Sequence, residues 1–157
     1  MRASWSACRS DRPHPVPNDS SEILHATAVA VAGRGLLIRG ASGSGKSGLA
    51  LEMMARGALL VADDRVIVSL RDGAPWLAPP APLSGMIEAR GIGLLNAATS
   101  GPVQLAAVLD LDEVETARLP QRRETMLQGQ RIPLLHKTAH PYFPAALVQY
   151  LKGGRKE

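Results

Sequence analysis

The segment LLIRGASGSGKSGLALEMMARG, residues 36–57, joins an apolar run to a glycine-rich stretch and then to a stretch with helical periodicity. The apolar run at 36–38 has the composition of a short buried strand. Leu49, Met53 and Met54 fall on one face of a helix. The segment therefore predicts a strand, a glycine loop and a helix in direct succession.

The glycine loop has the spacing of a phosphate-binding loop. Gly40, Gly45, Lys46 and Ser47 match the pattern G-x-x-x-x-G-K-[ST] at every position. Such a loop turns successive N–H groups inward, and the positive end of the following helix adds to the same concavity. We expect Lys46 to reach the β- and γ-phosphates of ATP and Ser47 to ligate Mg²⁺. The expected nucleotide-binding residues are Gly40, Ala41, Ser42, Gly43, Ser44, Gly45, Lys46 and Ser47.

Length and composition favour one ordinary globular domain. The chain has 157 residues, of which 45% are hydrophobic, and its net charge of +4 is spread along the sequence without an arginine-rich stripe. Nucleic acid is therefore not an expected partner. No apolar stretch reaches the ~20 residues needed to span a bilayer, so a membrane is not expected either. Cys8 is the single cysteine, which excludes an internal disulfide and favours a reducing, cytoplasmic compartment. We expect a disordered leader at 1–21, a catalytic domain at 22–152 and a basic tail at 153–157.

The segments around the loop favour a mixed sheet. TAVAVAG (27–33) and GLLIRG (35–40) predict a hairpin, while ALLVADD (58–64) and RVIVSL (65–70) predict further strands. PWLAPPAP (75–82) has the composition of a proline-rich loop. Hairpins next to a strand–loop–helix unit predict an α/β fold, in which a P-loop-containing mixed sheet is flanked by helices.

Two pairs of acidic residues compete for the role of the acid near the phosphates. Asp63 and Asp64 end one predicted strand, and their side chains point to opposite faces unless the strand ends between them. Asp110 and Asp112 end the apolar strand VQLAAVLDLDE, residues 103–113, as in P-loop proteins generally. Pattern alone leaves both pairs open.

A third motif indicates a family. MIEARGIGLLNA, residues 86–97, carries Glu88 and Arg90 on the same face of an extended stretch, followed by Gly91 and Gly93. Together with GASGSGKS and LLVADD, this motif resembles the signature of bacterial HPr kinase/phosphorylase over about residues 22–119. The resemblance implies the short form of that family, with the catalytic-domain fold that is also similar to phosphoenolpyruvate carboxykinase-like P-loop folds.

The resemblance also implies a set of site residues. Asp64 would be the acid/base with Asp63 supporting it, and Ser47 and Glu88 would be the magnesium ligands. The implied catalytic residues are His25, Lys46, Asp63, Asp64, Arg90 and Arg118.

The implied reaction is a reversible phosphoryl transfer from ATP to one serine of the phosphocarrier protein HPr. In reverse, inorganic phosphate would attack seryl-phosphorylated HPr and yield pyrophosphate, and the implied assembly is a homo-oligomer, a hexamer. Two positions differ from the family pattern. Gly48 stands where an acid is common, and RIPLLHKTAHPYF, residues 131–143, offers His136 and Lys137 without the glycine of the loop associated with dephosphorylation.

Two other functions stay open on sequence grounds. A nucleotide-sensing module would bind without transfer, although binding alone needs neither Asp64 nor Glu88. A small-molecule P-loop kinase would use Asp110 or Asp112 and would need an arginine-rich lid, for which residues 118–131 are the candidate.

Overall fold

The computed structural model describes residues 21–81 and 84–156. The proposed leader lies outside the described residues except for Ser21. The helices are α2 (Lys46–Met54) and α3 (Phe143–Gly153). The strands are β1 (Ser21–Leu24), β2 (Thr27–Val31), β3 (Arg34–Arg39), β4 (Leu59–Ala62), β5 (Val66–Arg71), β6 (Ala74–Ala78), β7 (Met86–Ala89), β8 (Gly93–Asn96), β9 (Val103–Val114), β10 (Arg123–Leu127) and β11 (Gln130–Lys137).

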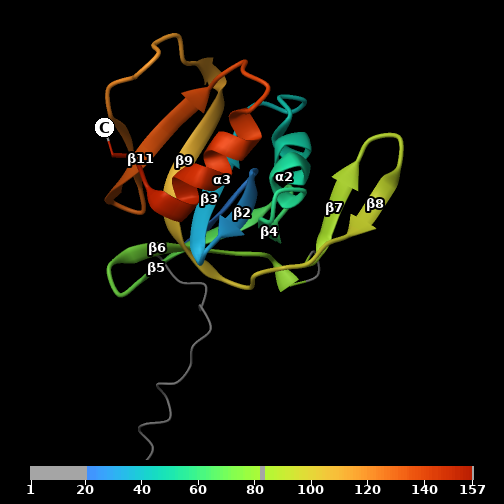
Figure 1. Cartoon of the computed structure of the whole chain (residues 1–157). Coiled ribbons are helices and arrows are strands. Elements are labelled where there is room, and N and C mark those ends of the chain that lie inside the picture. The colour runs from blue at the N-terminus through green and yellow to red at the C-terminus, as the bar shows by residue number, and fades with distance from the viewer. Residues whose placement is uncertain (1–20, 82–83, 157) are drawn as a thin grey trace, which may run out of the picture.

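A mixed, curled sheet forms the body of the molecule, as the sequence predicted (Figure 1). Its strands lie in the order β1-β5-β6-β9-β3-β2-β4, and β11 adds to β9 with β10 beside it. The predicted hairpin of β2 and β3 is antiparallel, whereas β3 runs parallel to β9. Strand β9 changes its partner along its length. Its first residues, Val103 and Gln104, pair with β6, and from Val108 onward it pairs with β11.

The predicted proline-rich loop is wrong over its first half, because Ala74–Ala78 form strand β6. Pro75 and Leu77 are buried while their neighbours are half-buried, which is the period of two expected of a strand. The Arg71 guanidinium lies over the Trp76 ring at 4.3 Å from its centroid. Pairing with β5 and β9 therefore outweighs the local preference of proline for a loop.

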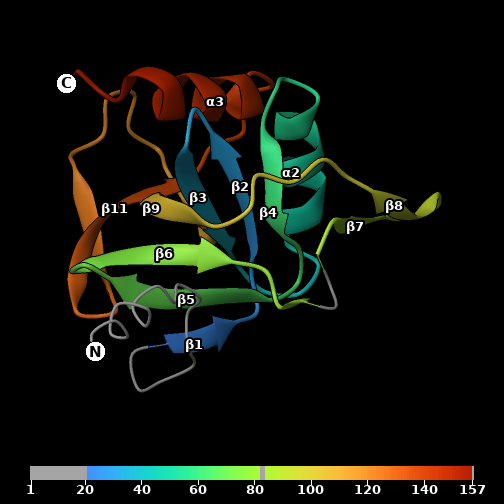
Figure 2. The same cartoon turned by 90° about the horizontal axis from the view of Figure 1, so that it is seen from below.

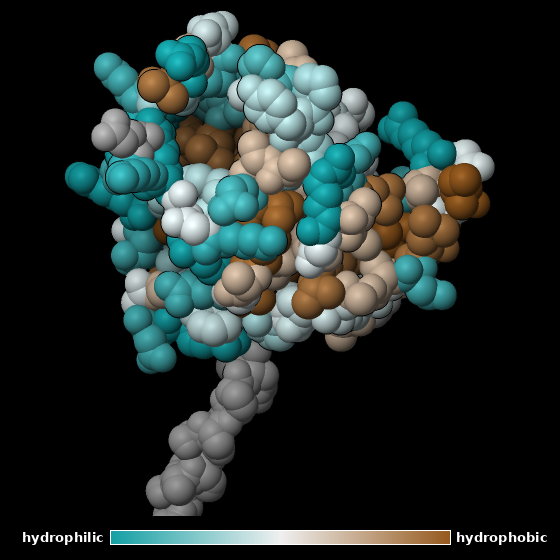
Figure 3. Space-filling view, viewed as in Figure 1, coloured by the Kyte–Doolittle hydropathy of each residue, from teal (hydrophilic) through white to brown (hydrophobic). Residues whose placement is uncertain are grey.

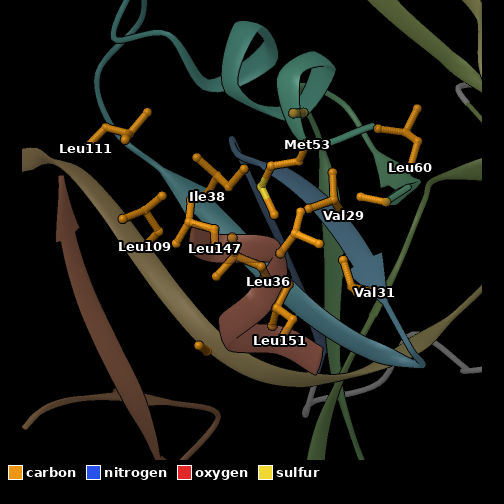
Figure 4. Close-up of a cluster of buried hydrophobic side chains, with 14 of the residues drawn as sticks. Val29, Val31, Leu36, Ile38, Met53, Leu60, Leu109, Leu111, Leu147 and Leu151 are labelled. Atoms are coloured by element: carbon orange, nitrogen blue, oxygen red, sulfur yellow. The ribbon is translucent and has the colours of Figure 1, made fainter. Parts of the chain in front are cut away.

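Helices α2 and α3 pack against one face of the sheet, and β5 and β6 cross its other face (Figure 2). Two hydrophobic cores lie on the two faces of the sheet: a helix-side core between the sheet and the helices, and an opposite core beneath β5 and β6. Successive side chains of β3 point to opposite faces, so Leu36 and Ile38 belong to the helix-side core and Leu37 to the opposite core. Figure 4 shows Met53 of α2 and Leu147 of α3 meeting in the helix-side core. The loop that begins α2 is thus fixed between a buried strand and a buried helix face.

The hairpin of β7 and β8 projects from the body beside α2 (Figures 1 and 2). It contains the MIEARGIGLLNA motif, and Arg90 follows directly on β7. Ile87 is buried and belongs to the helix-side core, which fixes the base of the hairpin. Within the described residues, no helix is long and apolar enough to cross a membrane.

Candidate active site

The phosphate-loop sequence folds as predicted into a loop between β3 and α2. Gly45 has φ +101° at the N-cap of α2, in the left-handed region that favours glycine. The Lys46 ammonium is nearly buried and donates to the Gly40 and Ala41 carbonyl oxygens at 2.9 and 3.1 Å. Among the described residues, Ser44 Oγ is a buried polar atom without a hydrogen-bond partner. A cationic side chain, an unpaired hydroxyl and the N–H groups of a helix N-terminus together fit a polyphosphate.

A cavity of about 490 Å³ opens over this loop. We call it the phosphate-loop cavity, and it brings together residues from four distant parts of the sequence. The implied site residues that line it are His25, Lys46, Ser47, Asp64, Glu88 and Arg90. Of these six, Lys46 and Ser47 lie at the start of α2 and Glu88 lies in β7, whereas the other three lie outside helices and strands.

Asp63 connects the loop to its surroundings. Its Oδ1 atom accepts hydrogen bonds from Ser47 Oγ at 2.7 Å and from Thr27 Oγ1 at 3.0 Å. Its Oδ2 atom accepts from the Glu88 N–H at 3.2 Å. The carboxylate therefore connects α2, β2 and β7.

Thr27 is a site residue that the sequence reasoning missed. It is fully buried and lines the phosphate-loop cavity. The available signal was its hydroxyl in the otherwise apolar strand TAVAV, because a buried polar side chain needs a partner. Here that partner is Asp63.

Asp64 faces the cavity with a different partner. Strand β4 ends at Ala62, so both acids follow the strand and can serve one site. Asp64 adopts φ +73°, an uncommon conformation for a residue other than glycine. Its Oδ1 atom lies 2.8 Å from His25 Nε2, and both side chains are more than half exposed. A solvent-accessible carboxylate held by a histidine at the cavity wall is suited to proton transfer.

Asp110 and Asp112 lie at the other end of the loop. Asp112 Oδ1 accepts a hydrogen bond from the Ala41 N–H at 3.1 Å. Asp110 Oδ2 lies 3.5 Å from Arg39 Nε, and its Oδ1 atom accepts from the Asp112 N–H. This pair therefore contacts the start of the loop, whereas Asp63 contacts Ser47 at its end.

The structure does not bring Arg118 to the phosphate-loop cavity. Its side chain lines a separate cavity that lies beside α3.

The donor set at Ser47 fits Mg²⁺ that is shared with phosphates. In the part of the chain that the structure describes, no three His, Cys, Asp or Glu side chains gather as a metal site. Mg²⁺ is usually held by one or two carboxylates together with phosphate oxygens and water. The Ser47 hydroxyl donates a hydrogen bond to Asp63, which leaves the oxygen lone pairs available, and Glu88 lines the same cavity.

We expect Gly40→Ala to damage this loop. A Cβ atom at Gly40 would lie 2.7 Å from Ser44 Oγ and 3.1 Å from Leu111 Cβ, so the loop must shift. Such overpacking lowers the free energy of unfolding by about 1–3 kcal/mol, which urea unfolding measures. We also expect nucleotide affinity to fall at least about tenfold, since about 1.4 kcal/mol of lost binding suffices.

Gly48→Ala is the matched control for the stability measurement. Gly48 lies in α2, and apart from its chain neighbours and the backbone of the helix itself, a Cβ atom there meets no atom within 4 Å. Alanine in a helix is favoured over glycine by roughly 1 kcal/mol, so this variant should be at least as stable as the parent. A Gly40→Ala protein as stable as Gly48→Ala would contradict the close packing of the loop on β9.

Comparison with known proteins agrees with this architecture. A family model described as the HPr Serine kinase C-terminal domain matches residues 19–111, which is more than half of the chain. The HPr kinase/phosphorylase of Streptococcus thermophilus is 39% identical over 123 residues, which cover 70% of this chain and 40% of that protein. The protein of the same name from Enterococcus faecalis is 32% identical over 153 residues, which cover 81% and 49%.

A solved structure shares the fold. The HPr(Ser) kinase/phosphatase from Coxiella burnetii matches with a TM-score of 0.73 and 22% identity, and the match covers 83% of this chain and 88% of that one. The chain spans less than half the length of the curated relatives described above. On the match of the family model and on the sequence identity, the chain belongs to the family of HPr serine kinase C-terminal domains.

Proposed function

We propose that this chain is a phosphotransferase that moves the γ-phosphoryl group of ATP to a serine hydroxyl of HPr. The observation that carries the proposal is one cavity lined by Lys46, Ser47 and Asp64. We assign phosphate binding to the Lys46 cation, metal binding to the Ser47 hydroxyl and the role of base to the solvent-accessible Asp64 carboxylate. HPr enters the proposal through the names of the relatives, which are called HPr kinase/phosphorylase.

The phosphate loop binds and orients the nucleotide. Its N–H groups and the Lys46 ammonium hold the phosphate oxygens, and the Ser44 hydroxyl is available as a further donor. Ser47 and Glu88 are the proposed magnesium ligands. Bound Mg²⁺ would neutralise charge on the phosphates. Asp63 fixes Ser47 in place by accepting a 2.7 Å hydrogen bond from its hydroxyl group.

Asp64 is the proposed general base. Asp63 already accepts three hydrogen bonds, so its lone pairs are largely engaged. Asp64 is the more exposed of the two, and His25 orients it. In the forward step, the serine oxygen forms a bond to the γ-phosphorus, the bond from that phosphorus to the bridging oxygen of ADP breaks, and the serine proton passes to Asp64.

The reverse reaction would use the same groups. Inorganic phosphate would attack the phosphorus of the serine ester, the serine oxygen would leave with a proton from Asp64, and pyrophosphate would form. Arg90 lines the cavity, and its guanidinium suits the second phosphate.

The direct test incubates the purified chain with γ-labelled ATP, Mg²⁺ and HPr, and then locates the phosphate by mass spectrometry. We expect label on one serine of HPr, and no label on an HPr variant in which that serine is alanine. Nucleotide binding without any transfer to HPr would favour a sensing module. A second incubation of phosphorylated HPr with inorganic phosphate measures pyrophosphate release.

Asp112→Asn separates this proposal from a small-molecule kinase that uses β9. Asparagine keeps an oxygen that can accept from the Ala41 N–H, so the contact with the loop should survive. We expect transfer to HPr within about tenfold of the parent, which corresponds to about 1.4 kcal/mol or less on the barrier. If Asp112→Asn lost transfer to HPr while Asp64→Asn transferred phosphate at nearly the parental rate, the assignment of Asp64 as the general base would be refuted.

A further inference from the structure

A second cavity lies between the end of β9, strand β11 and helix α3, and we call it the C-terminal cavity. Its volume is about 730 Å³, against about 490 Å³ for the phosphate-loop cavity, and the two share no lining residue. The lining residues fall in the ranges 114–123, 134–140 and 142–155. Figure 3 shows a hollow with hydrophobic residues at its floor at the upper left, where Figure 1 places β11 and α3. A cavity of this size accommodates a small organic molecule.

The floor of the C-terminal cavity is apolar. Phe143, Leu147 and Tyr150 are spaced three or four residues apart along α3, so they lie on one face of the helix, and Leu135 comes from β11. All four belong to the helix-side core or pack against it. This floor is therefore a fixed apolar surface with a flat aromatic component, and it suits the apolar body of a ligand.

The rim of the cavity carries cationic side chains. Arg118, Arg123 and Arg155 line it. Within the described residues, the Arg118 guanidinium has no hydrogen-bond or ion-pair partner, although it stands beside an apolar floor. A guanidinium presents several donors in one plane and binds carboxylate, sulfonate or phosphate oxygens well.

The carboxylate of Glu115 does not neutralise this rim. Glu115 pairs with Arg123, whose Nε and Nη2 atoms lie 3.2 and 3.1 Å from Glu115 Oε1. A hydrogen bond from the Ala117 N–H and the Arg123 side chain lower the pKa of Glu115. The opposite charges of Glu115 and Arg123 therefore neutralise each other, and Glu115 does not neutralise the positive charge of Arg118.

An aromatic pair borders the same cavity. The His140 and Tyr142 rings are stacked, with centroids 4.9 Å apart and planes 4° from parallel. Tyr142 is 62% exposed, so its ring is accessible to a ligand. The stacked pair extends the apolar surface from the floor to the rim.

We propose that the C-terminal cavity binds a small organic anion, whose apolar, ring-sized body lies on the α3 face and whose carboxylate, sulfonate or phosphate group contacts Arg118. This site is distinct from the proposed transfer chemistry, because it shares no residue with the phosphate-loop cavity.

The probe for the test is 8-anilinonaphthalene-1-sulfonate, with N-phenyl-1-naphthylamine as the uncharged compound of similar ring structure. Fluorescence titration of the whole chain should give saturable binding of the sulfonate, at least about tenfold tighter than that of the uncharged compound, since a charge-assisted hydrogen bond contributes that much. Arg118→Gln should remove this preference and leave the uncharged compound within about twofold of its parental affinity, because only the charged contact is lost. Equal affinities of the parent for both compounds would overturn the proposal.

A filling variant locates the binding. Ala146 is exposed on α3 and lines the cavity, so Ala146→Trp should occupy the space and weaken binding of the sulfonate at least about tenfold. Ala145 is also exposed on the same helix but does not line the cavity, so Ala145→Trp should bind like the parent. Thermal unfolding of both variants checks that they fold.

Two outcomes would refute the site. Parental affinity for the sulfonate in Ala146→Trp would show that the sulfonate binds elsewhere.

Sedimentation at the concentrations of the titration tests whether a second copy of the chain occupies the cavity instead of a small ligand. If Ala146→Trp changed the oligomeric state and Ala145→Trp did not, the cavity would be a contact between chains and the proposed ligand would be wrong.

Discussion

Asp64→Asn is expected to slow phosphoryl transfer to HPr by at least about 10²-fold, the usual scale for loss of a positioned general base. The amide cannot accept the serine proton. ATP affinity should stay within about threefold of the parent, because Lys46, Ser47 and the loop N–H groups, which hold the phosphates, are unchanged. Rates at saturating ATP and a separate ATP titration measure the two effects.

Two other acids are the controls for this prediction. Asp72 is exposed in the turn between β5 and β6, so Asp72→Asn should transfer at the parental rate. Asp63 accepts from Ser47, Thr27 and the Glu88 N–H, so Asp63→Asn should weaken magnesium-dependent ATP binding as well as transfer. If Asp64→Asn transferred normally while Asp63→Asn failed only in turnover, Asp63 would be the base.

Lys46→Ala is expected to weaken ATP binding at least about tenfold and to slow transfer by at least about 10²-fold, because a cation aimed at developing phosphate charge is lost. The Lys46 ammonium also donates to the Gly40 and Ala41 carbonyl oxygens. Its removal therefore leaves two loop carbonyls without that donor. Lys46→Met keeps most of the apolar stem and separates the loss of charge from the loss of packing.

Lys152 provides the matched control for Lys46. It is exposed in the last turn of α3, so Lys152→Ala should bind ATP and transfer phosphate as the parent does. Isothermal titration with ATP and Mg²⁺ compares the affinities. Parental ATP affinity in both Lys46→Ala and Lys46→Met would mean that the loop does not bind the phosphates.

Local sequence patterns predicted the elements that carry their own signals. The apolar run before Gly40, the glycine spacing and the helical periodicity after Lys46 each act over a few residues, and the structure has that strand, loop and helix in order. The hairpin of β2 and β3 and the mixed character of the sheet are confirmed for the same reason.

Strand β6 and helix α3 were not predicted from the sequence. Strand β6 contains Pro75, and its strand state depends on pairing with β5 and β9, which are distant in sequence. Helix α3 carried a usable pattern, because Leu147, Val148 and Leu151 recur on one face and all are buried.

The sequence by itself determined the phosphate loop, its strand and helix, and the family, because glycine spacing and side-chain periodicity are properties of adjacent residues. Only the tertiary structure decided which acid contacts which end of the loop. Strand order places β4 beside β2, so that Asp63 reaches Ser47 and Thr27, and it places β9 beside β3, so that Asp112 reaches Ala41. The location of Arg118 in the C-terminal cavity was likewise decided by the packing of β11 and α3. Such long-range pairings depend on the summed burial of both cores, which no single segment encodes.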